Sequence, residues 1–135
     1  MRYILSSLLL VFATMFFVYG KPKKTIENCK DIHTGAFYFY PPAFNKNYKI
    51  IREAGLQKEI TIGTRDTAVY KLKWIDDCTY TLDHLSGGTP IPENLRHRIY
   101  VQFLNVTKNY YVARICADSL RSKYCMTDTL WMNPR

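Results

Sequence analysis

The chain has 135 residues, a formal net charge of +8 and four cysteines. This length leaves room for one small domain after a leader, and the sequence contains no glycine-rich phosphate loop or nucleotide motif. The cationic excess favours acidic partners, although cations on the solvent faces of strands also serve solubility.

Residues 1–20 predict an export signal. Arg2 precedes an apolar run over 4–18, and the small residue Gly20 follows, with Val18 two places before it. The run is shorter than the ~20 apolar residues of a spanning helix, with an uncleaved anchor as the alternative. We therefore expect an extracytoplasmic protein, periplasmic or secreted, whose residues 21–135 form a single domain.

Segments with the alternation or β-rich composition of short strands follow one another along the rest of the chain. In 35–40, Phe37 and Phe39 alternate with tyrosines until Pro41 ends the pattern. Between the fifth and sixth segments, 83–97 reads as a long loop with a helical turn beginning at Pro92. The expected strands are 35–40, 48–53, 58–63, 67–75, 78–82, 98–104, 110–116 and 124–131.

Consecutive short strands joined by turns describe a meander, which removes its exposed edges by closing into a barrel. The sequence therefore predicts an all-β fold, an eight-stranded antiparallel meander barrel. A two-sheet β-sandwich is the alternative, because 83–97 could cross from one sheet to the other.

The four cysteines all follow the leader, which predicts two disulfides in an oxidising compartment. Residues 119–122 lie midway between Cys116 and Cys125, so a hairpin there places these two opposite each other. Cys29 then pairs with Cys78. A zinc site is the rival interpretation, but no C-x-x-C or H-x-x-x-H pair occurs, so we expect no metal.

No group of residues predicts catalysis. Ser86, Ser119 and Ser122 fall in expected turns, and the thiols are assigned to bridges. Asp76 and Asp77 are adjacent and point apart, unlike the facing carboxylates of a glycosidase. We expect neither an enzyme nor a cofactor.

Two stretches carry a family resemblance: "NCKDIHTGAF" at 28–37 and "WIDDCTYTL" at 74–82. They resemble small exported proteins of Bacteroidetes with the patterns N-C-x-D-x-x-x-G-x-F and W-x-x-D-C-x-Y-x-L. Many of these look like lipoproteins, whereas this chain lacks the cysteine that lipidation needs. Some carry a topoisomerase IV name, for which a chain of this size has no room. Gly35-Ala-Phe37 is also similar to the Gly-x-Trp opening of lipocalin-like, or calycin-like, barrels.

Two function classes follow from these expectations. The first is a non-enzymatic barrel that binds a small amphipathic or anionic ligand or an envelope partner. The second is a structural or interaction protein of the envelope with a filled core. Outside the cytoplasm, the cationic excess favours an anionic lipid, a glycan or a carboxylate ligand, or a membrane surface, over nucleic acid.

Arg52 and Arg114 are the candidate ligand-binding residues. Arg52 shares a strand face with Ile50, so if Ile50 points inward a guanidinium enters the barrel, where a ligand carboxylate would relieve its burial. In the opposite register Ile51 points inward and Arg52 lies in water. Arg114 lies on the same strand face as Cys116 and is the second candidate.

Overall fold

The computed structural model describes residues 28–90 and 92–135. The expected export signal over 1–20 lies outside the described residues. No helix in the described part of the chain is long and apolar enough to cross a membrane.

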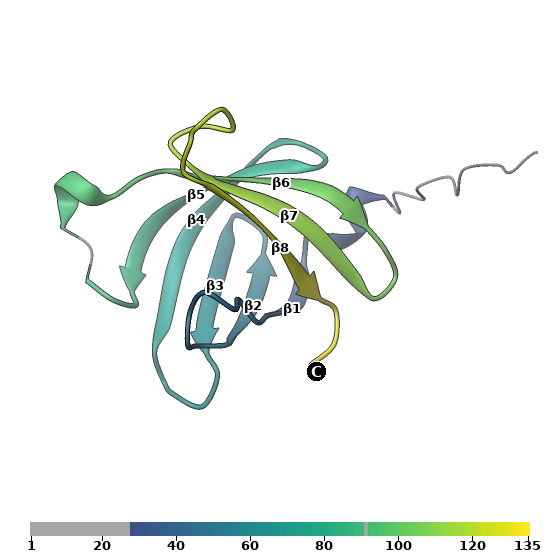
Figure 1. Cartoon of the computed structure of the whole chain (residues 1–135), viewed down its shortest axis with the longest axis horizontal. Helices are drawn as coiled ribbons and strands as arrows, with labels where there is room; N and C mark the ends of the chain where they lie inside the picture. Colours follow the sequence, from purple (N-terminus) through teal and green to yellow (C-terminus); the bar gives the residue numbers. More distant parts are fainter. Residues whose placement is uncertain (1–27, 91) are drawn as a thin grey trace, which may run out of the picture.

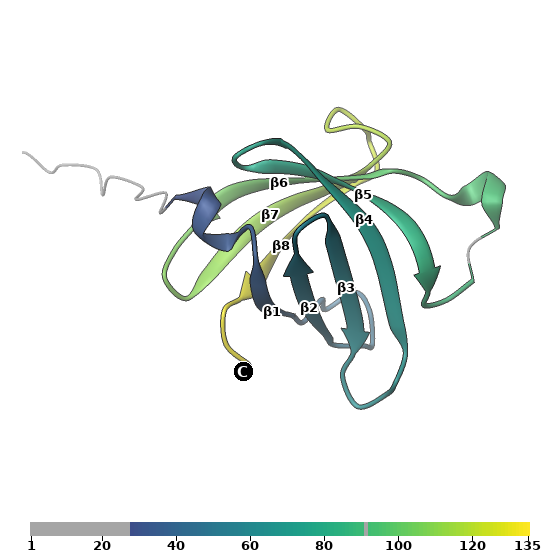
Figure 2. The same cartoon turned by 180° about the vertical axis from the view of Figure 1, so that it is seen from behind.

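The described chain forms a closed barrel of eight strands in sequence order (Figure 1; Figure 2). All neighbouring pairs are antiparallel, and β1 meets β8 through Tyr38 opposite Trp131 and Phe39 opposite Leu130. The predicted barrel is confirmed and the sandwich is excluded, because closure leaves a single continuous sheet. The strands are β1 (Gly35–Phe39), β2 (Tyr48–Glu53), β3 (Leu56–Thr61), β4 (Thr67–Asp76), β5 (Thr79–Gly87), β6 (Ile99–Val106), β7 (Tyr110–Ala117) and β8 (Cys125–Trp131).

Of the eight strands, only β2 has the expected bounds at both ends; four others differ by one residue, and β3, β5 and β6 differ by two residues or more. β3 begins at Leu56, because Gly55 adopts a φ of 72° and closes a tight turn directly after β2. β5 continues to Gly87 through the first part of the expected loop, held against β4 across a register shift between Val69 and Tyr70. β6 likewise continues to Val106. The expected helical turn is the 3-10 helix η2 (Glu93–Leu95), with Pro92 at its N-cap.

The two ends of the barrel differ. The 3-10 helix η1 (Cys29–Ile32) lies at one end, which we call the closed end, and η2 lies at the other, the open end (Figure 1). Ile32 is buried in the core, and the side chain of Asn28 caps η1 by accepting from the backbone N–H of Lys30. The connecting residues 40–47, 62–66, 88–90, 92–98 and 118–124 lie at the open end.

Both predicted disulfides are confirmed. Cys29–Cys78 ties η1 to the turn between β4 and β5 across a sequence separation of 49 residues. Cys116–Cys125 joins directly opposed residues of β7 and β8, as the hairpin midpoint predicted. The first bridge therefore anchors the segment that covers the closed end.

His33 belongs to the same end. Its Nε2 lies 2.8 Å from the backbone oxygen of Asp77, and its ring stacks on that of Trp74 with centroids 3.5 Å apart. Both contacts hold η1 against the β4–β5 hairpin, so His33 has a structural environment.

Candidate ligand-binding site

The half of the barrel near the open end is hollow. A cavity of about 320 Å³ lies between the strands, and its wall is mainly aliphatic and aromatic. Gln57 and Tyr80 lie on its inner side, and Phe39, Phe44 and Tyr70 line it together with Glu59. Its aliphatic lining consists of Ile50, Leu82, Ile99, Val101, Ile115, Met126 and Leu130.

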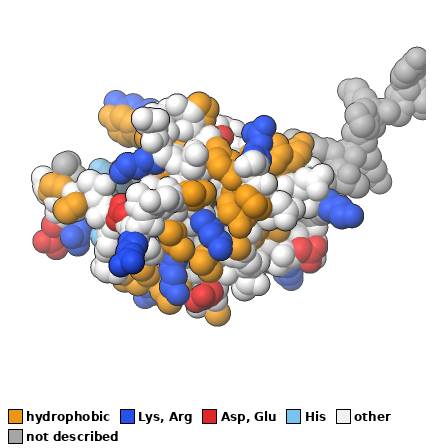
Figure 3. Space-filling model, turned by 90° about the horizontal axis from the view of Figure 1, so that it is seen from below, with side chains coloured by type: hydrophobic (Ala, Val, Ile, Leu, Met, Phe, Trp, Pro, Cys, Tyr) orange, Lys and Arg blue, Asp and Glu red, His pale blue; other side chains and the backbone are white. Residues whose placement is uncertain are grey.

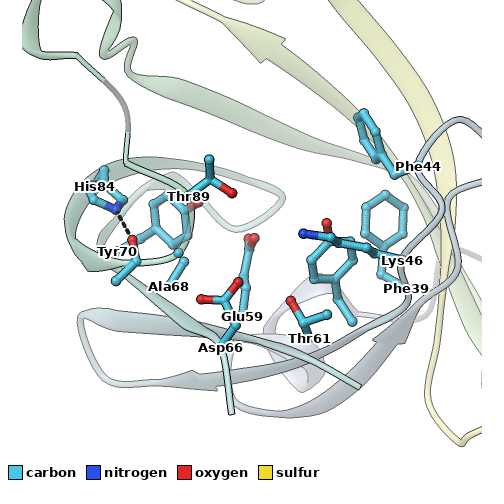
Figure 4. A pocket seen from close by; sticks show the side chains of 13 residues that line it. Phe39, Phe44, Lys46, Glu59, Thr61, Asp66, Ala68, Tyr70, His84 and Thr89 are labelled. Carbon is cyan, nitrogen blue, oxygen red and sulfur yellow. Dashed lines mark hydrogen bonds between the residues drawn. The ribbon is translucent and has the colours of Figure 1, made fainter. Parts of the chain in front are cut away.

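A second, more polar pocket of about 220 Å³ adjoins this cavity at the mouth of the barrel (Figure 4). Phe39, Phe44, Glu59 and Tyr70 line both spaces, so the pocket and the cavity share a wall. Figure 4 shows the Glu59 side chain pointing into the pocket, and Asp66 also lines it. The other polar side chains of the pocket are Lys46, Tyr48, Thr61, His84 and Thr89.

The closed half is filled by aromatic rings around a buried arginine. Arg52 is 1% exposed, so Ile50 and Arg52 point inward and the register that places Arg52 in water is wrong. The Arg52 guanidinium lies over the ring of Phe37 at 4.6 Å and over that of Tyr80 at 5.0 Å. Such contacts favour a cation that has left water.

Every guanidinium nitrogen of Arg52 has a partner within the chain. Nη1 donates to the backbone oxygen of Ile32 at 2.5 Å. Nη2 donates to the hydroxyl oxygens of Tyr111 at 2.7 Å and Tyr80 at 3.2 Å, and Nε donates to Oε1 of Gln57 at 3.3 Å. Arg52 therefore joins β2 to η1, β3, β5 and β7.

The charge of Arg52 is retained despite its burial. Burial alone lowers the pKa of the guanidinium, but attraction to the oxygens of Tyr111 and Tyr80 and the hydrogen bonds to them outweigh it, and the pKa is raised. Burial is also the main reason why the pKa of each of these two tyrosines is raised, so both hydroxyls stay neutral.

Gln57 connects this buried cation to the mouth. Its Oε1 accepts from Arg52 and from the Tyr80 hydroxyl, and its Nε2 donates to Oε1 of Glu59 at 2.9 Å. Because an arginine only donates, these contacts fix the orientation of the amide. Glu59 is thereby held pointing into the barrel.

Burial raises the pKa of the Glu59 carboxyl above its ordinary value. The hydrogen bond from Gln57 and the positive charge of Arg52 act in the opposite direction but do not cancel the effect of burial. The pKa of Tyr70 is raised as well, first by burial and then by the negative charge of Glu59. A carboxyl thus faces a poorly hydrated space.

His84 adds an acceptor at the mouth. Its Nε2 lies 2.8 Å from the backbone oxygen of Gly87 and must carry the proton, since a carbonyl only accepts. Its Nδ1 is buried and has no hydrogen-bond partner among the described residues. Gly87 is fixed as glycine because its φ is 73° and a Cβ would lie 1.8 Å from the backbone oxygen of Thr67.

The two candidate arginines are not brought together. Arg114 alternates with the inward residues Ala113 and Ile115 on β7, so its side chain lies on the outer face, 3.7 Å from the Sγ of Cys125. Neither Arg52 nor Arg114 lines the cavity or the mouth pocket. Binding of an anionic ligand by either arginine stays a prediction, and their positions give it no support.

The inward polar residues of β3 were missed from the sequence. Gln57, Glu59 and Thr61 alternate with Lys58 and Ile60, and the structure turns the polar set inward. The alternation itself is a usable signal, but Ile60 and Ile62 form an apolar alternation on the opposite face of the same segment. These polar side chains can point inward because Gln57 pairs with Arg52. Glu59 and Thr61 line the polar mouth pocket.

In comparisons with known proteins, no family model, no curated protein and no solved structure matches the chain. The cavity and its contacts are therefore the basis on which we assign a function.

Proposed function

We propose that this protein is a non-enzymatic, exported binding barrel whose cavity takes the apolar part of a small amphipathic ligand. The observation that carries the proposal is the cavity of about 320 Å³, walled by aliphatic and aromatic side chains. This volume lies at the lower end of the range of small-molecule pockets, which are mostly apolar with a few polar groups. The mouth pocket provides those polar groups.

The division of the barrel into two halves supports binding over a purely structural role. The closed half is packed with Phe37, Tyr80, Phe103 and Tyr111 around Arg52, in ring contacts of 4.9–5.7 Å. This half supplies the core that a small domain needs. In the open half, the inward side chains leave a cavity. A barrel with a purely structural role would be expected to fill this space with larger side chains.

An extracytoplasmic location is part of the proposal. Two disulfides in a chain of 135 residues are typical of an oxidising compartment, and residues 1–20 have the pattern expected of an export signal. Lysine and arginine side chains are spread among apolar and neutral ones over the face in Figure 3 rather than gathered in one patch. Cations distributed in this way are typical of a solvated surface rather than of a binding patch for an anionic partner. We therefore place ligand binding in the cavity.

The same substitution at an inner and an outer position of the barrel tests the proposal. Leu82 lines the cavity, whereas Leu104 on β6 is 37% exposed. We expect Leu82→Trp to abolish binding of the neutral fluorescent probe N-phenylnaphthylamine, and Leu104→Trp to leave it unchanged. Native mass spectrometry of the exported protein would detect a co-purified ligand. Equal probe binding by both variants would place the probe outside the barrel and refute the proposal.

A further inference from the structure

We propose that the mouth pocket binds a protonated amine, so that the ligand is an amphipathic amine whose ammonium group lies between Glu59 and Asp66 and whose apolar part enters the cavity. This inference rests on the proposed function, since it names the head group of the ligand that the cavity holds. Three independent features of the pocket support it.

The first feature is the pair of carboxylates. Glu59 accepts from Gln57 through Oε1, and its other oxygen has no hydrogen-bond partner in residues 28–90 and 92–135. The Asp66 side chain lines the same pocket and has neither a hydrogen bond nor an ion pair within the same part of the chain. An ammonium group carries donors only, so it complements these acceptors.

The second feature is the set of aromatic rings around the carboxylates. Phe39, Phe44, Tyr48 and Tyr70 all line the mouth pocket. The faces of aromatic rings attract organic cations, and cages of such rings are a common means of recognising ammonium groups. Phe39, Phe44 and Tyr70 also line the cavity. An ammonium group held between these rings would therefore lie directly beside the apolar space that takes the rest of the ligand.

The third feature is the free acceptor on His84. His84 lines the same pocket, and its buried Nδ1 has no partner in the described residues, while Nε2 is used by Gly87. A buried acceptor without a partner is unfavourable, and a donor supplied by a ligand would satisfy it. The mouth pocket therefore offers acceptors from β3, the β3–β4 turn and β5.

An anionic head group fits the same pocket poorly. Arg52 is separated from the cavity by Gln57 and Tyr80, and its donors are used within the chain. Among the described residues, Lys46 is the only lysine or arginine that lines the mouth pocket, and it is exposed on the loop between β1 and β2. A carboxylate ligand would have to lie against Glu59 and Asp66, which is unfavourable for like charges.

Three probes with one alkyl chain separate head-group recognition from binding as such. Octylamine, octanol and octanoate carry a positive, a neutral and a negative head group at pH 7, and calorimetric titration gives the affinity of each. We expect octylamine to bind about tenfold or more tightly than the other two, as expected for a charge-assisted hydrogen bond.

Two variants test the assigned residues. Glu59→Gln keeps the shape and the contact with Gln57 but removes the charge, and should weaken octylamine binding about tenfold without changing octanol binding. Lys46→Met removes the like charge and should tighten octylamine binding about twofold. Glu53→Gln, an exposed residue at the closed end, is the matched control for loss of one negative charge and should have no effect.

The outcomes distinguish the two proposals. Equal affinity of the three probes, or tighter binding of octanoate, would overturn the amine inference while leaving the binding barrel in place. Failure of all three probes to bind would overturn the binding barrel and the amine inference with it. Loss of octanol as well as octylamine binding in Glu59→Gln would give Glu59 a structural role and also refute the inference.

Discussion

Arg52 and Glu59 lie at opposite ends of one hydrogen-bonded chain, in which the Gln57 amide accepts from Nε of Arg52 at 3.3 Å and donates to Glu59 at 2.9 Å. The cation belongs to the filled half of the barrel and the carboxyl to the hollow half. One side-chain amide therefore links the packing of the closed end to the polar group that the ligand meets. Arg52 therefore contributes to the packing of the closed end, whereas Glu59 faces the ligand that we propose at the open end.

Arg52 is expected to be essential for stability. Substitution by Met would leave the backbone oxygen of Ile32 and the hydroxyl of Tyr111 buried without a donor. We expect the free energy of unfolding to fall by about 3 kcal/mol or more, measured by urea denaturation. Arg114→Met, on the outer face, should change it by less than about 0.5 kcal/mol. Equal stability of both variants would mean that the Arg52 contacts contribute little.

The raised pKa of Glu59 predicts a pH-dependent stability. The pKa of Glu59 in the folded state exceeds the unfolded value near 4.5, so the folded protein binds this proton more tightly than the unfolded chain does. The resulting stabilisation is fully present below the unfolded pKa. It is lost as pH rises through the folded-state pKa. Glu59→Gln should therefore be more stable than the parent at pH 8, with the difference vanishing at pH 4. The titratable groups that face Glu59 in the mouth pocket are Lys46, Tyr48, Asp66, Tyr70 and His84.

Thermal unfolding of the two proteins across this pH range measures the effect. Glu53→Gln is the control, since it removes a surface carboxyl that pairs with Lys58 and should bring no gain in stability at pH 8. A difference for Glu59→Gln that is the same at pH 4 and pH 8 would contradict the assignment of a raised pKa to this carboxyl.

The two disulfides are expected to differ in their contribution. Cys29–Cys78 closes a separation of 49 residues and Cys116–Cys125 one of 9 residues. Loop entropy in the unfolded chain then predicts a loss of about 4 kcal/mol for Cys29→Ala with Cys78→Ala, and about 2.5 kcal/mol for Cys116→Ala with Cys125→Ala. Chemical denaturation of the two double variants tests this order. A larger loss from the second pair would show that local packing outweighs loop entropy.

The barrel could be predicted because its strands alternate clearly and follow one another in order. Phe37 and Phe39 identified the inner face of β1, and the midpoint between Cys116 and Cys125 gave the register of the last hairpin. The same rule of alternation could not decide the register of β2, because Ile50 and Ile51 are equally apolar and one residue apart.

The site was harder to predict because it depends on contacts between distant strands. The partners of Arg52 are separated from it by 5 to 59 residues along the chain, and no local pattern announces them. Glu59 resembled an ordinary surface carboxylate in sequence. Only the inward register of β3 places it in the cavity, and that register follows from pairing with β2 and β4.

The central claim, that the open half of the barrel is a ligand cavity, is tested most directly by methyl spectra of methionine in solution. Of the four methionines, Met126 lines the cavity, whereas Met132 packs against the core just beyond β8 and is the internal control. Titration with octylamine should move the Met126 methyl resonance in a saturable way and leave that of Met132 in place. A Met126 resonance that is unchanged by octylamine and also by the neutral probe octanol, or equal and unsaturable shifts of both methyls, would contradict the claim.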